Sequence, residues 1–89
     1  MYRSAASPNR GVPVSTNERL IAYHLSRLKD KNPEVRLNSI AELVLLQATD
    51  ALDALEALYY HDPDERVRQE AQRAGRALFM LKKQQTSPR

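Results

Sequence analysis

Apolar residues recur at helical spacing in four segments of the chain, and the alternation typical of strands is almost absent. In the first segment, residues 15–30, Ile21, Leu25 and Leu28 fall on one helical face. The second segment, residues 32–47, is apolar nearly all round, which is typical of a helix that is covered on more than one side. The pattern predicts an all-α fold.

The third and fourth segments, residues 49–60 and 62–84, are amphipathic. The third places its apolar residues on one side: Leu52, Leu55, Leu58 and Tyr59. The fourth has one apolar stripe: Val67, Ala71, Ala74, Gly75, Leu78 and Leu81. Three of those six residues are Ala or Gly, so another helix can approach this stripe closely.

Two of the segments open on residues that favour a helix start. Asn32 is a candidate N-cap, with Pro33 at the first helical position. In the fourth segment we expect Asp62 to be the cap, followed by Pro63 in the first turn, with Glu65 closing a capping box.

The chain matches itself when it is shifted by 32 residues. The stretch "LKDKNPEVR" from Leu28 lies over "YHDPDERVR" from Tyr60, so that Asp30 falls on Asp62. The shift also superimposes two Val-Arg pairs: Val35 on Val67 and Arg36 on Arg68. A fixed offset that carries a whole helix–turn–helix is the mark of a solenoid unit.

The pattern D-x-x-x-x-VR, followed by small residues on a helical stripe, resembles HEAT repeats. The short repeat length resembles the phycobilisome-lyase HEAT-like type. The resemblance covers residues 17–83, about two units, and implies two helix–turn–helix repeats that form a four-helix α-solenoid fragment. Because this family serves mainly as scaffold and adaptor in many systems, the fold alone does not fix a function.

The resemblance also implies a role for the repeated turn. In that family the Arg after the Val commonly pairs with the acidic residue of the preceding turn, within or between units. The implied structural ladder consists of Asp30, Arg36, Asp62 and Arg68, with Val35 and Val67 facing inward. An exposed ladder would contribute only ~0–1 kcal/mol per pair. The alternative is that the two arginines bind an anionic ligand.

The ends of the chain differ from the middle. Residues 1–16 contain Pro8 and Pro13 without any helical period, which predicts a disordered or partner-bound tail. We expect the repeat domain to span 17–83 and a flexible tail to occupy 84–89. The sequence has no cysteine, no apolar run of membrane-spanning length and no signal-peptide h-region, so we expect a cytoplasmic protein.

Charge is distributed unevenly although the net charge is only +3. Residues 17–65 hold ten acids against five Lys and Arg, whereas 66–83 hold six Lys and Arg against the single acid Glu70. The bulk charge is mild and aromatics are not interleaved with the basic residues, which makes nucleic acid an unlikely partner.

The fourth segment is the strongest candidate for partner binding. The apolar residues near its C-terminal end exceed what two units can cover, and its basic side could dock an acidic partner. The candidate partner-binding residues are Arg66, Arg73, Arg76, Phe79, Met80, Lys83 and, on the first segment, Tyr23. Two alternatives stay open: the basic side is simply solvated, or the N-terminal tail folds back over the apolar residues with Val12 and Val14.

Catalysis has little support in the sequence. His24, the His61-Asp62 pair and Asp64 are residue types that bind metals, but a metal site needs ligands that converge from several helices. No Gly-rich phosphate loop, serine nucleophile elbow or cysteine nucleophile is present. We expect no enzyme activity, no cofactor, no metal and no small-molecule substrate.

The most consistent interpretation is a non-catalytic protein–protein interaction module. It would act as a small adaptor, assembly factor or accessory subunit, bound to a protein partner or to further copies of itself. One alternative, from the resemblance, is an accessory subunit in a phycobilisome or tetrapyrrole-pigment system. The other is a nucleic-acid-binding HEAT-like protein that uses the basic fourth segment.

Overall fold

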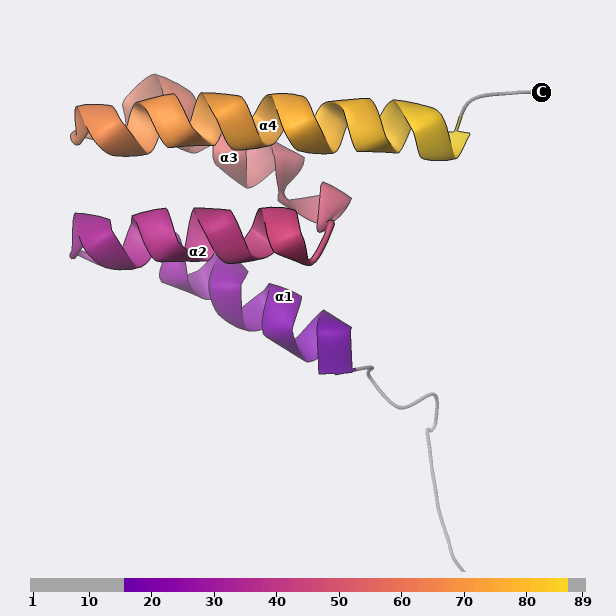
Figure 1. Cartoon of the computed structure of the whole chain (residues 1–89). Coiled ribbons are helices and arrows are strands. Elements are labelled where there is room, and N and C mark those ends of the chain that lie inside the picture. Colours follow the sequence, from indigo (N-terminus) through magenta and orange to yellow (C-terminus); the bar gives the residue numbers. More distant parts are fainter. Residues whose placement is uncertain (1–15, 87–89) are drawn as a thin grey trace, which may run out of the picture.

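The computed structural model describes residues 16–86, and this part of the chain is entirely helices and short connections. The elements are α1 (Thr16–Arg27), α2 (Pro33–Leu45), the 3-10 helix η1 (Thr49–Ala51), α3 (Leu52–His61) and α4 (Glu65–Thr86). The prediction of an all-α helical repeat fragment is confirmed (Figure 1).

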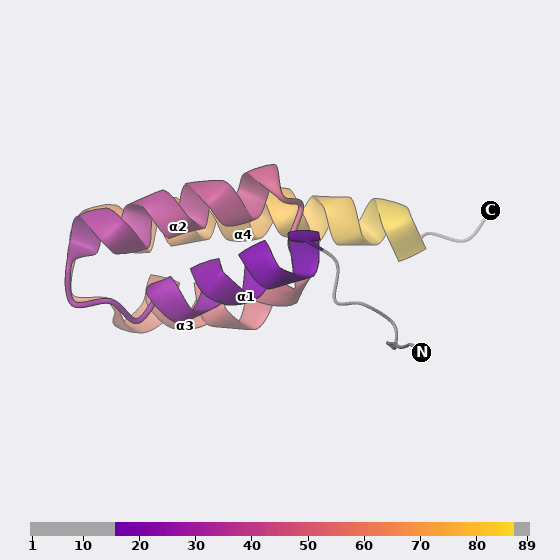
Figure 2. The same ribbon diagram turned by 90° about the horizontal axis from the view of Figure 1, so that it is seen from below.

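The helices form two layers. α2 and α4 lie side by side in one layer, and α1 and α3 form the other (Figures 1 and 2). Each consecutive pair is an antiparallel hairpin, which we call the first hairpin (α1–α2) and the second hairpin (α3–α4). The two hairpins stack on each other, and the C-terminal part of α4 runs past the end of α2 (Figure 2).

The core lies where the two hairpins meet. Leu43, Leu55, Val67 and Leu78 are fully buried there. Each such side chain contributes roughly 1.5–3 kcal/mol of hydrophobic stabilisation relative to an exposed one. Ala71 is also buried, and its small side chain allows the helices to approach closely. The apolar face of each helix therefore stabilises the fold only when the two hairpins bury these faces against each other.

The start of α2 matches the sequence prediction. Asn32 has an extended backbone, and its side chain accepts a hydrogen bond from the N–H of Glu34 at 2.9 Å. Pro33 is the first helical residue, where its missing N–H would have no partner in any case. The cap and the proline together fix where α2 begins.

The predicted start of α4 is wrong by two residues. α4 begins at Glu65, and the capping residue is Asp64, whose Oδ1 accepts the N–H of Arg66 at 2.7 Å. Asp62 instead ends α3, and Pro63 lies in the connection. The reason is the repeat itself, because the 32-residue shift places the cap Asn32 on Asp64 and not on Asp62.

The second helices of the two hairpins end differently. After α2, Gln47 adopts a positive φ of 56°, and its N–H donates to the carbonyl of Val44. The N–H of Ala48 donates to the carbonyl of Leu43, which completes a Schellman motif. At the equivalent position on α4 the chain has Phe79, where the helix simply continues.

α4 extends beyond the predicted domain boundary at residue 83. It continues to Thr86, because Lys83, Gln84 and Gln85 are all good helix formers. The rest of the two expected tails, including the expected cover by Val12 and Val14, lies outside the described residues.

Candidate functional site

A buried ion pair connects the two hairpins. Arg36 Nε donates to Asp62 Oδ2 at 2.8 Å, and Arg36 Nη2 donates to Asp62 Oδ1 at 2.9 Å. The side chains are only 9% and 2% exposed, respectively. The carboxylate also accepts the N–H of Asp64. This bidentate pair is a structural contact between units, with little room for a ligand.

The same arginine also holds its own turn. Arg36 Nη1 donates to the carbonyls of Asp30 at 2.7 Å and Lys31 at 3.1 Å. In the second hairpin, Arg68 Nη1 donates to the carbonyl of Asp62 at 2.7 Å. The carboxylate of Asp30 accepts the N–H of Asn32 and lies 3.3 Å from Arg27. The repeated bond is therefore from guanidinium to backbone carbonyl.

The implied ladder consequently has one carboxylate–guanidinium step among the described residues, from Arg36 to Asp62. Within residues 16–86, Arg68 contacts Asp62 only through the backbone carbonyl. Val67 is fully buried between the hairpins, whereas Val35 is only partly buried because no unit precedes it in the described structure.

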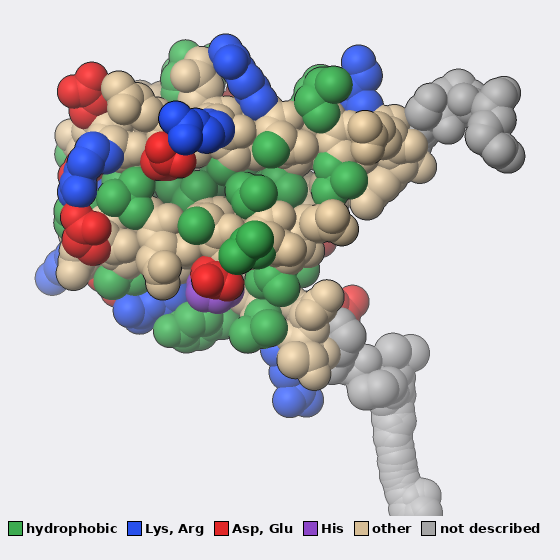
Figure 3. Space-filling view, viewed as in Figure 1, with side chains coloured by type: hydrophobic (Ala, Val, Ile, Leu, Met, Phe, Trp, Pro, Cys, Tyr) green, Lys and Arg blue, Asp and Glu red, His purple; other side chains and the backbone are tan. Residues whose placement is uncertain are grey.

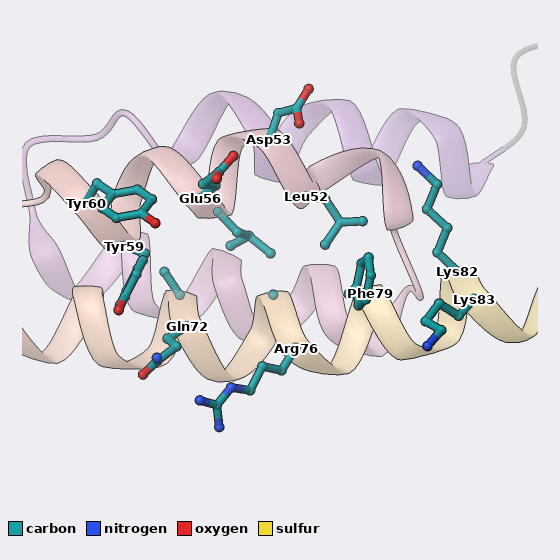
Figure 4. A pocket seen from close by; sticks show the side chains of 13 residues that line it. Leu52, Asp53, Glu56, Tyr59, Tyr60, Gln72, Arg76, Phe79, Lys82 and Lys83 are labelled. Atoms are coloured by element: carbon teal, nitrogen blue, oxygen red, sulfur yellow. The ribbon is translucent and has the colours of Figure 1, made fainter.

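A groove of about 580 Å³ runs between α3 and α4 on the side away from the first hairpin (Figure 4). We call it the α3–α4 groove. The residues that line it from α3 are Leu52, Asp53, Leu55, Glu56, Tyr59 and Tyr60. The residues that line it from α4 are Ala71, Gln72, Gly75, Arg76, Phe79, Lys82 and Lys83.

The groove has an apolar floor and two edges of opposite charge. Leu55 and Ala71 are core residues that reach its floor, and Gly75 leaves its centre open. A Cβ built on Gly75 meets nothing within 4 Å. The acidic edge is formed by Asp53 and Glu56 on α3, and the basic edge is formed by Arg76 and Lys83 on α4 (Figure 4). Lys82 lies at the end of the groove and reaches toward the N-terminal end of α3 (Figure 4).

Large aromatic side chains lie exposed in this groove. Tyr60 is 63% exposed, Phe79 53% and Tyr59 37%. The helical period predicts Tyr59 to be packed; that prediction is wrong, because the side of α3 that carries Tyr59 faces the groove. Exposed aromatics beside an apolar groove are typical of a protein-binding surface.

Three of the seven predicted partner-binding residues come together in this groove: Arg76, Phe79 and Lys83. The structure places the other four elsewhere. Met80 is 55% exposed on another side of α4. Arg73 lies 3.7 Å from Glu70 on the same helix. The apolar cluster near the end of α4 is therefore divided between the groove and another face.

Arg66 is engaged in an exposed cluster of acids. Its Nη1 donates to Glu34 Oε2 at 2.7 Å, and its Nη2 donates to Asp64 Oδ2 at 3.1 Å. The side-chain hydrogen bonds to Asp64 and Glu34 raise the pKa of Arg66, and the side-chain hydrogen bond from Arg66 lowers the pKa of Asp64. Arg66 thus joins the two hairpins at the surface.

Tyr23 lies in a smaller depression between α1 and α2, of about 410 Å³. It is 54% exposed, and its ring packs edge-on against His24. His24 Nδ1 lies 3.1 Å from Ser39 Oγ, so this histidine contacts a hydroxyl of the neighbouring helix. Tyr23 belongs to the first hairpin and does not contribute to the α3–α4 groove.

On the face seen in Figure 1, the basic side chains do not merge into one surface. Figure 3 shows Lys and Arg side chains lying among Asp and Glu side chains on the face seen in Figure 1. Among residues 16–86, no group of three or more His, Cys, Asp and Glu side chains is placed to hold a metal ion. None of the helices within residues 16–86 combines the length and the hydropathy that a membrane-spanning helix requires.

Sequence reasoning missed the acidic edge and the two tyrosines as parts of the site. The signal was present in the repeat, because Gly75 and Arg76 occupy the register positions of Leu43 and Val44. Residues that pack against the next hairpin in the first unit are small or charged in the second. That difference marks the open face of the second hairpin.

One of three comparisons with known proteins, the scan against protein-family models, agrees with this architecture. A search of curated proteins gave no match, and a search of solved structures gave none either. The family model for HEAT repeats matches residues 14–75, well over half of the 89-residue chain. With its two stacked hairpins and the turn that is repeated in each, this chain belongs to the HEAT repeat family.

Proposed function

We propose that this chain is a non-catalytic protein–protein interaction module that buries the α3–α4 groove against another protein chain. It would act as an adaptor, an assembly factor or an accessory subunit of a larger complex. The observation that carries the proposal is the groove, where Tyr60 and Phe79 are each more than half exposed over an apolar floor. HEAT repeats commonly mediate protein–protein interactions, which supports the same conclusion.

The groove suits a helical partner. An amphipathic helix can place its apolar side on the floor between α3 and α4, and Phe79 and Tyr60 can act as anchors at the two ends. Arg76 and Lys83 would contact acidic side chains of the partner and speed its association. We assign Arg66, Arg73, Met80 and Tyr23 no direct contact in this groove, because they lie outside it.

Two finer assignments belong to the same proposal. The 32-residue repeat supports the phycobilisome-lyase HEAT-like type and, through it, the alternative of an accessory subunit in a pigment system. The absence of cysteine is consistent with a cytoplasmic location. Nucleic-acid binding receives less support, because Arg66 and Arg73 already lie beside acidic side chains.

Affinity capture with tagged chains from a native cell extract tests the proposal. Gly75→Leu adds a side chain in the groove at a position where a Cβ meets nothing within 4 Å, and it should abolish capture of proteins that the native chain retains. The matched control is Ala77→Leu, which adds the same side chain to an exposed position of α4 outside the groove. Equal capture by the native chain and both variants would contradict a role for the groove.

A further inference from the structure

We propose that the α3–α4 groove binds a second copy of this chain, docked face to face so that α3 of each copy lies over α4 of the other. This inference rests on the proposed function and names the partner. The docking is a closed two-fold contact, in which every pair of residues across the interface occurs twice.

Two charged side chains of the groove, Glu56 and Arg76, are self-complementary in position. Glu56 on the acidic edge and Arg76 on the basic edge lie at the same level along the helices, on opposite sides of the groove (Figure 4). Within residues 16–86 neither side chain has a partner of opposite charge. Both are therefore available to a chain that approaches from outside.

The symmetry axis follows from these charges. A two-fold axis parallel to the groove exchanges the two edges, so Glu56 of each copy meets Arg76 of the other. An axis across the groove would instead place acidic edge on acidic edge and basic edge on basic edge. Like charges at an interface are strongly unfavourable, so the charge pattern selects the first orientation.

The apolar residues fit the same orientation. Leu52 and Phe79 also lie at one level on opposite sides of the groove (Figure 4). The same operation places Phe79 of each copy on Leu52 of the other and covers a ring that is 53% exposed in one chain. Gly75 leaves space at the centre, which allows the incoming α3 to approach α4 closely.

A further HEAT-like hairpin stacked in the manner of the first is a poorer occupant. The first hairpin presents Ile40 and Leu43 to its neighbour, and both are buried. The equivalent positions of α4 are Gln72 and Gly75, which offer little apolar surface to a third unit. The groove is therefore better matched to its own face than to a continued stack.

The test is a charge exchange in the purified full-length chain, followed by sedimentation equilibrium. The native chain should form a dimer. Glu56→Arg and Arg76→Glu should each raise the dimer dissociation constant by about 30-fold, because each makes both symmetric pairs repulsive. An equimolar mixture of the two variants should form a heterodimer close to the native affinity, because both pairs are then opposite in charge.

The matched control for Arg76→Glu is Arg19→Glu, which makes the same change of net charge on α1, away from the groove, and should leave the dimer intact. A native chain that stays monomeric up to about 1 mM, or single variants that dimerise as well as the native chain, would overturn the inference. So would a mixture that stays as weak as its components. If a monomeric native chain still loses captured proteins on Gly75→Leu, the dimer fails while the proposed function stands.

Discussion

The two hairpins share one turn but differ in the face that follows it. In both, an arginine donates to the carbonyl of the aspartate six residues earlier, at 2.7 Å. Among residues 16–86, only the arginine of the first hairpin also reaches a carboxylate, that of Asp62 in the next unit. The comparison shows that the turn is a local device, whereas the ion pair requires a neighbouring hairpin.

The packing faces of the two hairpins also differ, because the face of the first is covered and the face of the second is open. Where the first hairpin packs with Leu43, the second has Gly75 at the same register and an open groove. One face is covered and apolar, and the other combines exposed aromatics with charged edges. Equivalent positions in a repeat thus lie in different environments according to whether another unit covers them.

The largest difference between the two hairpins is expected when Arg36 and Arg68 are each replaced by alanine, because the two variants should lose different amounts of unfolding free energy. Arg36→Ala leaves the buried carboxylate of Asp62 without its guanidinium and should lower the free energy of unfolding by about 3–5 kcal/mol. Arg68→Ala removes one hydrogen bond to a carbonyl and should cost only about 1 kcal/mol. Urea denaturation followed by circular dichroism measures both.

Equal losses for the two arginine variants would mean that the pair between hairpins adds nothing beyond the local turn. A small domain has little stability to lose, so Arg36→Ala is expected to be partly unfolded even without urea.

The second prediction compares Leu43 and Gly75, which share one register position. Leu43→Ala opens a cavity in the contact between hairpins and should cost about 3 kcal/mol. Gly75→Ala should instead stabilise the monomer by up to about 1 kcal/mol, because it favours the helix and its Cβ meets no neighbour within 4 Å. Thermal unfolding of dilute protein should show shifts of opposite sign, and a destabilised Gly75→Ala would contradict this account.

The smallest effect concerns the two helix caps, Asn32 and Asp64. The hydrogen bond from the Arg66 side chain lowers the pKa of Asp64 below its ordinary value of 3.8. A carboxylate with a lowered folded-state pKa stabilises the fold above its unfolded-state pKa, and this stabilisation is lost as the pH falls through the folded-state pKa. The native chain should therefore lose stability on acidification below about pH 4.

Asp64→Asn copies the cap of the first hairpin and should remove this contribution to the pH dependence while keeping α4 capped. Unfolding free energies at neutral pH and at acid pH, compared between the native chain and the variant, give the difference. Parallel curves for the two proteins would show that the exposed pair of Asp64 and Arg66 has no measurable effect.

Much of the fold follows from local patterns. The four helices, the cap at Asn32 and the repeat were all predictable, because helical periodicity and capping act over a few residues. The cap of α4 was predictable as well, since the 32-residue shift aligns Asn32 with Asp64. The prediction chose Asp62 because an Asp-Pro pair also suits a helix start, and only the geometry assigns Asp62 to the ion pair with Arg36.

The candidate site was less predictable. Helical period places Tyr59 on the apolar side of α3, but it cannot tell whether a neighbour covers that side. Arg73 and Arg76 lie one turn apart on the same basic helix, yet one lies beside Glu70 and the other borders the groove. Such distinctions depend on contacts across helices that sequence spacing does not encode.

The sequence by itself determined the helices, their turn chemistry and the repeated unit, because these depend on interactions between residues close along the chain. Tertiary structure alone decided which of two equivalent arginines is buried and which of two equivalent faces remains open. The physical reason is that the burial of a side chain depends on whether another hairpin packs over it. In the first hairpin, which the second covers, Arg36 is held in a buried ion pair and Leu43 is fully buried, whereas Gly75, at the position of Leu43 in the second hairpin, lines an open groove.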